Sequence, residues 1–340
     1  MMTEQALLRV EDLRVEFKTR RGVASVLNGV SFQVRPRETL CVVGESGCGK
    51  SMTALALLRL IPTPPGKIAA GRVLYGDEDL LQASPARMRE IRGNRISMIF
   101  QEPMTSLNPV YTVGQQIGEA LQLHTGLDAR QVRERTIAML RQVGIPAPER
   151  RVDDYPHQMS GGMRQRVMIA MALACEPEVL IADEPTTALD VTVQAQIFDL
   201  LRQLQADRGT AIVMITHDMG AVAEMADRVM VMYAGRVIEE GTVDQVLQQP
   251  LHPYTQGLIA CLPELGSSAG GERAVLPEIP GMVPSIWELG SNCAFHQRCA
   301  HATDLCRSQV PPMVQKAQGH GVACWLYPAT QAQALEEVPA

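Results

Sequence analysis

Short hydrophobic runs recur along the chain and alternate with segments whose apolar residues have helical spacing. Four of these runs are apolar almost throughout, at residues 39–43, 96–100, 179–182 and 211–216. Continuous apolar runs of this length are typical of strands buried on both faces of a parallel sheet. Between them, segments such as 51–60 and 191–205 have the spacing of helices. The alternation predicts an α/β fold whose sheet is covered by helices on both faces.

The remaining segments predict three further features. Residues 104–159 begin as a loop and continue as helix-forming sequence, which indicates a helical insertion in the sheet domain. Residues 229–241 predict a hairpin that turns at Ala234 and Gly235. Residues 251–292 are rich in proline, glycine and serine, and four of the eight cysteines follow them. We therefore place a domain boundary near residue 250.

Each predicted parallel strand is followed by a glycine or a polar residue. These residues are Gly44, Gln101, Asp183 with Glu184, and His217. Ligands of open α/β sheets bind at the carboxyl ends of the strands, and those ends meet at one edge. The sequence therefore predicts a single site at that edge.

The first strand leads into a complete phosphate-loop motif, G-x-x-x-x-G-K-S, at the start of a predicted helix. Its residues are Gly44, Glu45, Ser46, Gly47, Cys48, Gly49, Lys50 and Ser51, and Met52 follows. The glycines let backbone N–H groups turn toward phosphates, and the helix N-terminus adds a favourable dipole. Lys50 offers a cation to the β- and γ-phosphates, and the Ser51 hydroxyl is a ligand for Mg²⁺.

Two carboxylates follow the third predicted strand. Asp183 is placed to hold Mg²⁺ through water, and Glu184 to orient or deprotonate an attacking water. Acidic residues at a strand end also serve as helix N-caps. The phosphate loop elsewhere in the chain favours the catalytic interpretation.

Composition excludes several classes of protein. The chain has 340 residues and a formal net charge of −6, which argues against a dedicated nucleic-acid binder. Hydrophobic residues make up 46%, which excludes wholesale disorder. No apolar run approaches the roughly 20 residues of a membrane span, and the N-terminus lacks the pattern of a signal peptide. We therefore expect a cytosolic chain whose cysteines serve metal binding, redox chemistry or burial rather than disulfides.

The order of motifs after the phosphate loop carries a family resemblance. Gln101, the sequence MSGGMRQR, the Asp183-Glu184 pair, Ala188-Leu189-Asp190 and His217 follow one another. This order resembles the nucleotide-binding subunits of ABC transporters. The stretches FQEPMTSLNPVYTVGQQI, YPHQMSGGMRQRVMIAMALA, LIADEPTTALDVTVQAQI and HPYTQGL, with the four-cysteine tail, resemble more closely the D-type ATP-binding subunits of dipeptide and oligopeptide importers.

The resemblance implies the architecture and the role of each matching residue. It implies a P-loop NTPase (RecA-like) core with an N-terminal antiparallel β-subdomain and a helical subdomain at about 104–174, within a nucleotide-binding domain of residues 1–250. A cysteine-containing C-terminal domain would occupy residues 251–340. Gln101 would reach the metal and the attacking water, and His217 would contact the γ-phosphate. Ser160, Gly161 and Gly162 would contact the γ-phosphate of nucleotide held by the partner ATPase. Asp190 would lie at the seam of the dimer.

Two positions keep more than one interpretation. Phe17 matches the position of an aromatic ring that stacks on adenine, but it also alternates with Leu13 and Val15 like a core strand residue. Met163 stands where the commonest family signature has glutamine. This departure leaves open whether the two composite ATP sites hydrolyse equally.

Four cysteines near the C-terminus predict a metal centre. Five, six and seventeen residues separate Cys293, Cys299, Cys306 and Cys324. Four thiolates suit either a tetrahedral zinc site or an iron–sulfur cluster. The tight pairs of structural zinc sites are absent, and the looser spacing and the resemblance favour a [4Fe–4S] cluster. Buried free cysteines or a disulfide pair remain the alternatives.

The resemblance implies an ATPase that drives peptide import with ATP and Mg²⁺ at the cytoplasmic face of the inner membrane. Its partners would be a second, related ATPase subunit, two membrane permeases and, indirectly, an extracytoplasmic peptide-binding protein. Alternatives are the same architecture importing nickel or modified peptides, and a soluble ABC ATPase that acts on ribosomes or DNA or serves redox regulation. The sequence does not identify the cargo.

Overall fold

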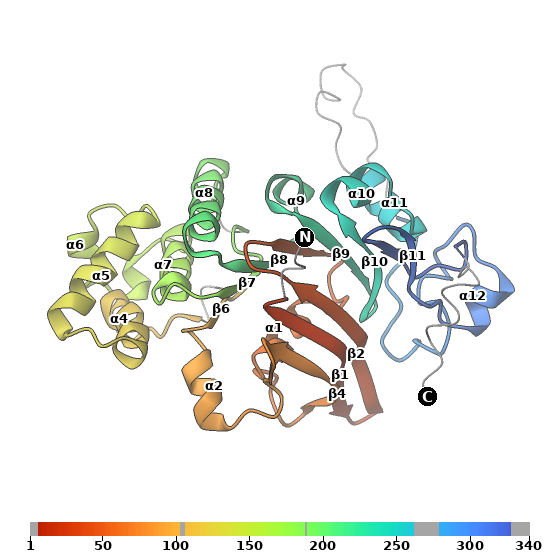
Figure 1. Ribbon diagram of the computed structural model, residues 1–340, viewed down its shortest axis with the longest axis horizontal. Coiled ribbons are helices and arrows are strands. Elements are labelled where there is room, and N and C mark those ends of the chain that lie inside the picture. The colour runs from red at the N-terminus through yellow and green to blue at the C-terminus, as the bar shows by residue number, and fades with distance from the viewer. Residues whose placement is uncertain (1–5, 103–105, 188, 262–278, 328–340) are drawn as a thin grey trace, which may run out of the picture.

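The computed structural model describes residues 6–102, 106–187, 189–261 and 279–327. Its centre is an eight-stranded sheet with the strand order β11-β12-β10-β9-β3-β8-β7-β6 (Figure 1). Strands β9, β3, β8, β7 and β6 are parallel, and β10, β12 and β11 extend the sheet as antiparallel strands. The bounds are β3 Thr39–Val43, β6 Ile96–Ile99, β7 Val179–Asp183, β8 Ala211–Ile215, β9 Arg228–Tyr233, β10 Arg236–Thr242, β11 Val314–Ala317 and β12 His320–Val322. The predicted parallel strands and the hairpin are confirmed.

A second sheet, formed mainly by the N-terminal part, packs beside the first. It is antiparallel with the order β2-β1-β4-β5. The bounds are β1 Leu8–Thr19, β2 Gly22–Val34, β4 Gly66–Tyr75 and β5 Glu78–Asp79. Alternate residues of β1 such as Leu13 and Val15 are fully buried, so one face of this sheet lies on the core.

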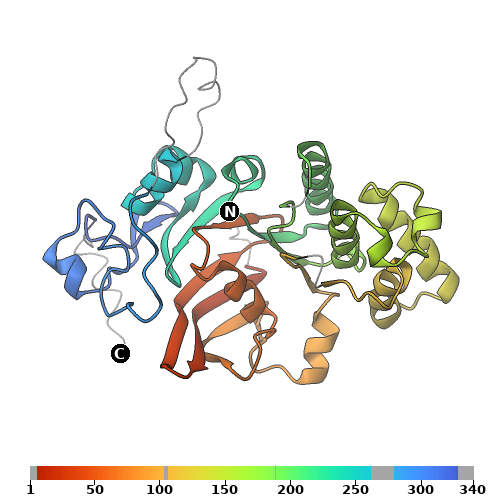
Figure 2. The same cartoon turned by 180° about the vertical axis from the view of Figure 1, so that it is seen from behind.

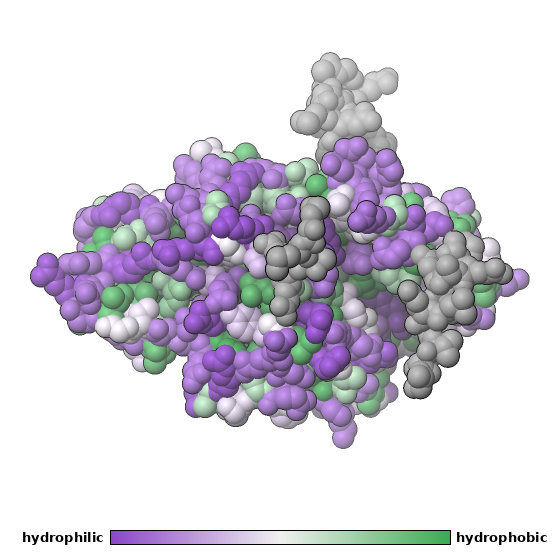
Figure 3. Space-filling model, in the orientation of Figure 1, coloured by the Kyte–Doolittle hydropathy of each residue, from purple (hydrophilic) through white to green (hydrophobic). Residues whose placement is uncertain are grey.

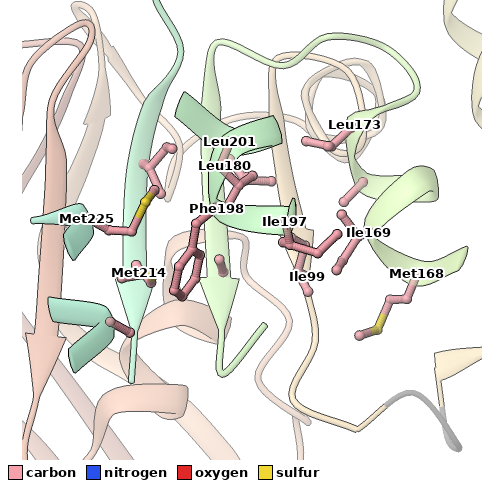
Figure 4. Close-up of a cluster of buried hydrophobic side chains, with 14 of the residues drawn as sticks. Ile99, Met168, Ile169, Leu173, Leu180, Ile197, Phe198, Leu201, Met214 and Met225 are labelled. Carbon is pink, nitrogen blue, oxygen red and sulfur yellow. The ribbon is translucent and has the colours of Figure 1, made fainter. Parts of the chain in front are cut away.

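Helices cover both faces of the parallel sheet. On β7, Leu180 and Ala182 belong to one core cluster, whereas Val179 and Ile181 belong to the other. The first cluster contains side chains of α8 and α9, as Figure 4 shows for Phe198, Leu201 and Met225 around Leu180 and Met214. The second contains side chains of α1, α2 and the N-terminal sheet. The bounds are α1 Lys50–Leu57, α2 Pro85–Ile91, α8 Val191–Arg208 and α9 Met219–Met225.

A group of helices lies between β6 and β7 in the chain and projects to one end of the molecule, opposite the C-terminal part (Figures 1 and 2). Capping boxes begin the two longer helices that precede α7, with Thr112 before α4 and Asp128 before α5. The bounds are α4 Val113–His124, α5 Ala129–Gln142, α6 Pro148–Arg151, η1 Pro156–Gln158 and α7 Gly161–Leu173.

The C-terminal part is joined to the main sheet. Strand β12 pairs with β10, with Val322 opposite Glu239. Helices α10 Val243–Gln248, α11 Pro253–Ala260 and α12 Asp304–Ser308 complete the described chain. Hydrophilic and hydrophobic residues are interspersed on the face of the molecule that Figure 3 shows. Within the described ranges, no helix is both long and apolar enough to cross a membrane.

Candidate active site

The carboxyl ends of β3, β6, β7 and β8 meet at one edge of the parallel sheet, as the sequence predicts. A cavity of about 740 Å³ opens there. Its lining includes Gly44, Glu45, Ser46, Gly47, Gly49, Lys50, Ser51, Met52, Gln101, Glu184 and His217. Most of the predicted site residues are therefore brought to one place by strands that are far apart in the sequence.

The phosphate loop depends on glycine for its shape. Gly49 has φ of 105° immediately before α1, and Gly44 has φ of 151°. A Cβ atom on Gly44 would lie 2.3 Å from the backbone oxygen of Met232. The buried Lys50 ammonium donates hydrogen bonds to the carbonyl oxygens of Gly44 at 2.7 Å and of Glu45 at 3.1 Å. This places a cation inside the curve of the loop, where phosphate oxygens would bind.

Asp183, at the end of β7, is only 2% exposed. Burial raises the pKa of its carboxyl group, while a hydrogen bond with the Ser51 side chain opposes that rise. Its Oδ1 atom is buried, and none of the described residues makes a hydrogen bond to it. A carboxylate beside a hydroxyl is the oxygen donor set that Mg²⁺ prefers, and an orphaned carboxylate oxygen is what a bound cation would satisfy. Ser51 and Asp183 therefore fit a magnesium site.

Glu184 lies at the cavity with its carboxylate held by three side chains. Its Oε1 lies 3.2 Å from His217 Nδ1, and its Oε2 accepts a hydrogen bond from Thr187 Oγ1 at 3.1 Å. Gln101 makes a further side-chain hydrogen bond to it. Burial favours the neutral acid, but the contacts with His217, Thr187 and Gln101 outweigh it and lower the pKa of Glu184. The carboxylate is therefore ionised at neutral pH, as a group that orients or deprotonates water must be.

The predicted partner-facing residues lie outside this cavity on exposed turns. Ser160 is the N-cap of α7 and accepts a hydrogen bond from Met163 N at 3.3 Å. Gly161 is exposed and Gly162 is partly exposed. Asp190 is the exposed N-cap of α8. The N-termini of α7 and α8 therefore lie at the surface, where a second chain has access to their N–H groups and N-cap side chains.

Besides Asp183 and the exposed turns, two predicted binding residues are not part of the cavity lining. Cys48 is fully buried beneath the loop, and burial raises the pKa of its thiol. Phe17 is partly buried on β1, and its ring lies beside Gly66 on β4. The position of Phe17 agrees with the core-strand interpretation, and its stacking on adenine stays a prediction.

Sequence reasoning missed two contacts that organise the site. The Thr187 hydroxyl reaches the Glu184 carboxylate, and the buried Gln165 amide donates to the carbonyl oxygen of Pro185. Gln165 thereby connects α7, whose N-cap is Ser160, to the segment after Glu184. Both residues occur inside the motifs quoted above. The sequence does not indicate their roles, because each role depends on a partner that only the structure shows.

The four C-terminal cysteines are brought together. The Cys293 N–H donates to the Cys306 carbonyl oxygen at 2.9 Å. Burial raises the pKa of Cys324 to about 11, and charge repulsion from Cys293, Cys299 and Cys306 adds to the rise. All eight cysteines of the chain are free thiols. Among the described residues, no group of three or more His, Cys, Asp or Glu side chains is arranged to hold a metal ion.

Comparison with known proteins identifies the family. Residues 27–187 match the family model described as ABC transporter, and residues 238–306 match that described as oligopeptide/dipeptide transporter, C-terminal region. The probable peptide ABC transporter ATP-binding protein y4tR of Sinorhizobium fredii is 52% identical over 319 residues, which cover 94% of each chain. The chain belongs to the ATP-binding subunits of peptide ABC transporters. Like the other members of the ABC family, it is an ATPase of the P-loop NTPase fold.

Other members of this peptide-transporter family have names that specify oligopeptides or dipeptides. The oligopeptide transport ATP-binding protein OppD of Bacillus subtilis is 49% identical, over 96% of this chain and 90% of its own. The dipeptide transport ATP-binding protein DppD of the same organism is 47% identical, over 95% of each chain.

Solved ABC cassettes share the fold. The ATP-binding cassette MJ0796, solved as a dimer in a post-hydrolysis state bound to ADP and Pi, is 27% identical with a TM-score of 0.64. The match covers 69% of this chain and 98% of that one. The structure of cbiO1 from Clostridium perfringens is 30% identical with a TM-score of 0.59, over 72% of this chain and 92% of its own.

Proposed function

We propose that this chain is the ATP-hydrolysing subunit that energises import of dipeptides or oligopeptides through an ABC transporter. The observation that carries the proposal is the convergence of the phosphate loop, Gln101, Asp183, Glu184 and His217 at one sheet edge. The relatives, which are named as peptide transport subunits, support peptides as the cargo.

Hydrolysis depends on positioning and electrostatic stabilisation. Lys50 and the loop N–H groups would hold the β- and γ-phosphates, and Ser51 and Asp183 would hold Mg²⁺, which neutralises charge that develops on the phosphates. The ionised Glu184 would orient the attacking water and take its proton. Gln101 and His217, which both contact Glu184, would lie near the γ-phosphate.

A second, related ATPase subunit would complete the site. The exposed Ser160 turn would contact the γ-phosphate of nucleotide held by that partner, and Asp190 would lie at the seam. Val191, next to Asp190, is 83% exposed, and a partner chain would cover it. ATP would favour the closed pair because it contacts both chains, and hydrolysis would remove that preference.

Permease subunits would bind the helical insertion at residues 104–158. A groove of about 680 Å³ runs along α4 and α5 and is lined by Tyr111, Gln115, Glu119, Arg133 and Asp153 among others. Tyr111 is 52% exposed and Val110 is 70% exposed. An apolar rim beside charged side chains suits a cytoplasmic helix of a membrane protein. The subunit would thus lie at the cytoplasmic face of the inner membrane, with an extracytoplasmic peptide-binding protein delivering cargo.

The four cysteines would hold a [4Fe–4S] cluster within the C-terminal domain, residues 251–340. What supports this is that the four thiols are free and that each of the other three adds to the rise in the pKa of Cys324. Anaerobically purified protein should contain iron and absorb at about 400 nm. Protein that contains zinc and no iron would exclude the cluster.

The transport function is tested with the assembled complex. The chain is co-expressed with the permeases and binding protein of the proposed transporter and reconstituted into vesicles. Peptide uptake should require ATP and should cease with Glu184→Gln. Uptake of nickel instead of peptides would support the alternative cargo, and failure to co-purify with any permease would contradict a transport role.

A further inference from the structure

Glu45, the second residue of the phosphate loop, is held by two residues from the C-terminal part of the chain. Arg298 donates to both carboxylate oxygens, from Nη1 to Oε2 at 2.6 Å and from Nη2 to Oε1 at 2.9 Å. The Tyr254 hydroxyl accepts a hydrogen bond from the Glu45 backbone N–H at 2.8 Å. The loop is therefore fixed at one residue through both its backbone and its side chain.

Arg298 is itself rigidly placed. Its side chain is only 5% exposed, and its guanidinium lies 5.9 Å from the ring centre of Tyr233 and 5.7 Å from that of Phe295. It also donates to the carbonyl oxygens of Pro280 at 2.9 Å and Ile279 at 3.2 Å. A planar guanidinium held by this many contacts loses little further freedom when it pairs with a carboxylate.

The charge of Glu45 gives this pair a functional consequence. Glu45 lines the cavity in which the triphosphate would bind, so an unpaired carboxylate there would repel the phosphates. Arg298 neutralises that carboxylate with a two-point ion pair. The buried arginine cannot lose its proton, so the neutralisation is permanent.

We propose that Arg298 is a positioning residue for ATP binding, and that it makes the phosphate loop depend on the four-cysteine segment. Arg298 immediately precedes Cys299, and Phe295 beside it follows Cys293 by two residues. A change in the fold of this segment would therefore reach Glu45 through a single side chain. The inference depends on ATP binding and not on the identity of the cargo or of the metal.

The test measures equilibrium binding of a fluorescent N-methylanthraniloyl ATP with Mg²⁺ to the full chain. Arg298→Gln should weaken binding at least about fivefold, because it leaves a charged partner unpaired. The double variant Glu45→Gln/Arg298→Gln should bind more tightly than Arg298→Gln alone, since it removes the repelling charge. Arg307→Gln is the matched control, because Arg307 pairs with Asp304 at the surface of the same segment.

Each outcome decides the proposal. Unchanged affinity in Arg298→Gln would overturn it, and so would a double variant as weak as the single one, which would indicate a purely structural role. If Arg298→Gln does not fold, Arg298→Lys keeps the positive charge beside Glu45 and should bind ATP nearly as well as the unmodified chain, and a loss of about fivefold or more in that variant would overturn the proposal. Normal binding by the unmodified chain in the same assay separates failure of this inference from failure of ATP binding itself.

Discussion

His217 Nδ1 lies 3.2 Å from Glu184 Oε1, and this contact joins the ends of the neighbouring strands β8 and β7. Glu184 has a positive φ of 49°, a conformation that few non-glycine residues adopt. Backbone strain of this kind persists when surrounding contacts hold it. The residue that would activate water is thus fixed by its neighbours before any nucleotide binds.

Glu184→Gln should abolish steady-state hydrolysis while ATP still binds. Loss of a general base costs about 100-fold to 10,000-fold in rate, and the amide keeps the size of the side chain. Phosphate release and nucleotide binding should be measured on the same preparation. Glu224→Gln, which alters a surface ion pair with Arg202, is the control. Normal turnover by Glu184→Gln would contradict its assignment as the base.

Asp183→Asn should raise the Mg²⁺ concentration needed for half-maximal ATPase activity by about tenfold or more. The substitution removes the negative charge from a buried carboxylate, one oxygen of which has no hydrogen-bond partner in the part of the chain that the structure describes. Because burial raises the pKa of Asp183, losing the charge should not destabilise the fold. A thermal unfolding curve checks that point. An unchanged Mg²⁺ dependence would exclude Asp183 as a metal-binding residue.

Lys50→Ala should weaken ATP binding by about tenfold or more, because it removes the cation inside the phosphate loop. Lys67→Ala provides the comparison, since Lys67 is exposed on β4. Titration calorimetry with a non-hydrolysable ATP analogue measures both. If the two variants bound equally well, the phosphate-cradle interpretation of the loop would be wrong.

His252 should make the protein less stable as the pH falls. It is the buried N-cap of α11, its Nδ1 accepts a hydrogen bond from Tyr254 N, and burial lowers its pKa to about 3. The unfolded chain binds a proton near its ordinary pKa of about 6.5, whereas the folded chain does not. Stability is therefore lost progressively from about pH 6.5 down to about pH 3, by at most about 1.4 kcal/mol per pH unit.

The variant His252→Asn isolates this effect, because asparagine can cap the helix but does not titrate. Urea unfolding at pH 7.5, 6 and 5 should show a shallower loss of stability in the variant. Glu239, which accepts from His252 N, and His320, which contacts Glu239, are unchanged in this comparison. If the free energy of unfolding fell equally with pH in the two proteins, His252 would take up its proton in the folded chain as readily as in the unfolded chain.

The sequence predicts the elements whose signals are local. The apolar runs of β3, β7 and β8 have no competing pattern, and α8 begins at Val191, where the helical spacing begins. Strand β4 was not predicted, because Gly71 interrupts its alternation at a register shift opposite β1. A Cβ atom at residue 71 would lie 2.6 Å from Leu13 Cα. The need for glycine there comes from the close approach of β1, which the sequence does not show.

The residues of the candidate site likewise divide into those that a local motif predicts and those that only the structure brings together. Residues with a characteristic motif were predicted, because phosphate binding dictates their types and order. The contact of Arg298 with Glu45 joins residues 253 positions apart. Glu45 stands at a variable position of the phosphate-loop motif, and no local pattern marks Arg298 as its partner. Tyr254 was part of the quoted HPYTQGL stretch, but its hydrogen bond to the phosphate loop required the structure.

Sedimentation of the Glu184→Gln chain, mixed with the proposed second ATPase subunit, tests the central claim most directly. That claim is a nucleotide site completed by another chain's Ser160 turn. With Mg²⁺ and ATP the account predicts a two-chain complex, which should dissociate without nucleotide and should not form with Ser160→Arg. Chains that remain monomeric at saturating ATP, or associate equally well without it, would contradict the account.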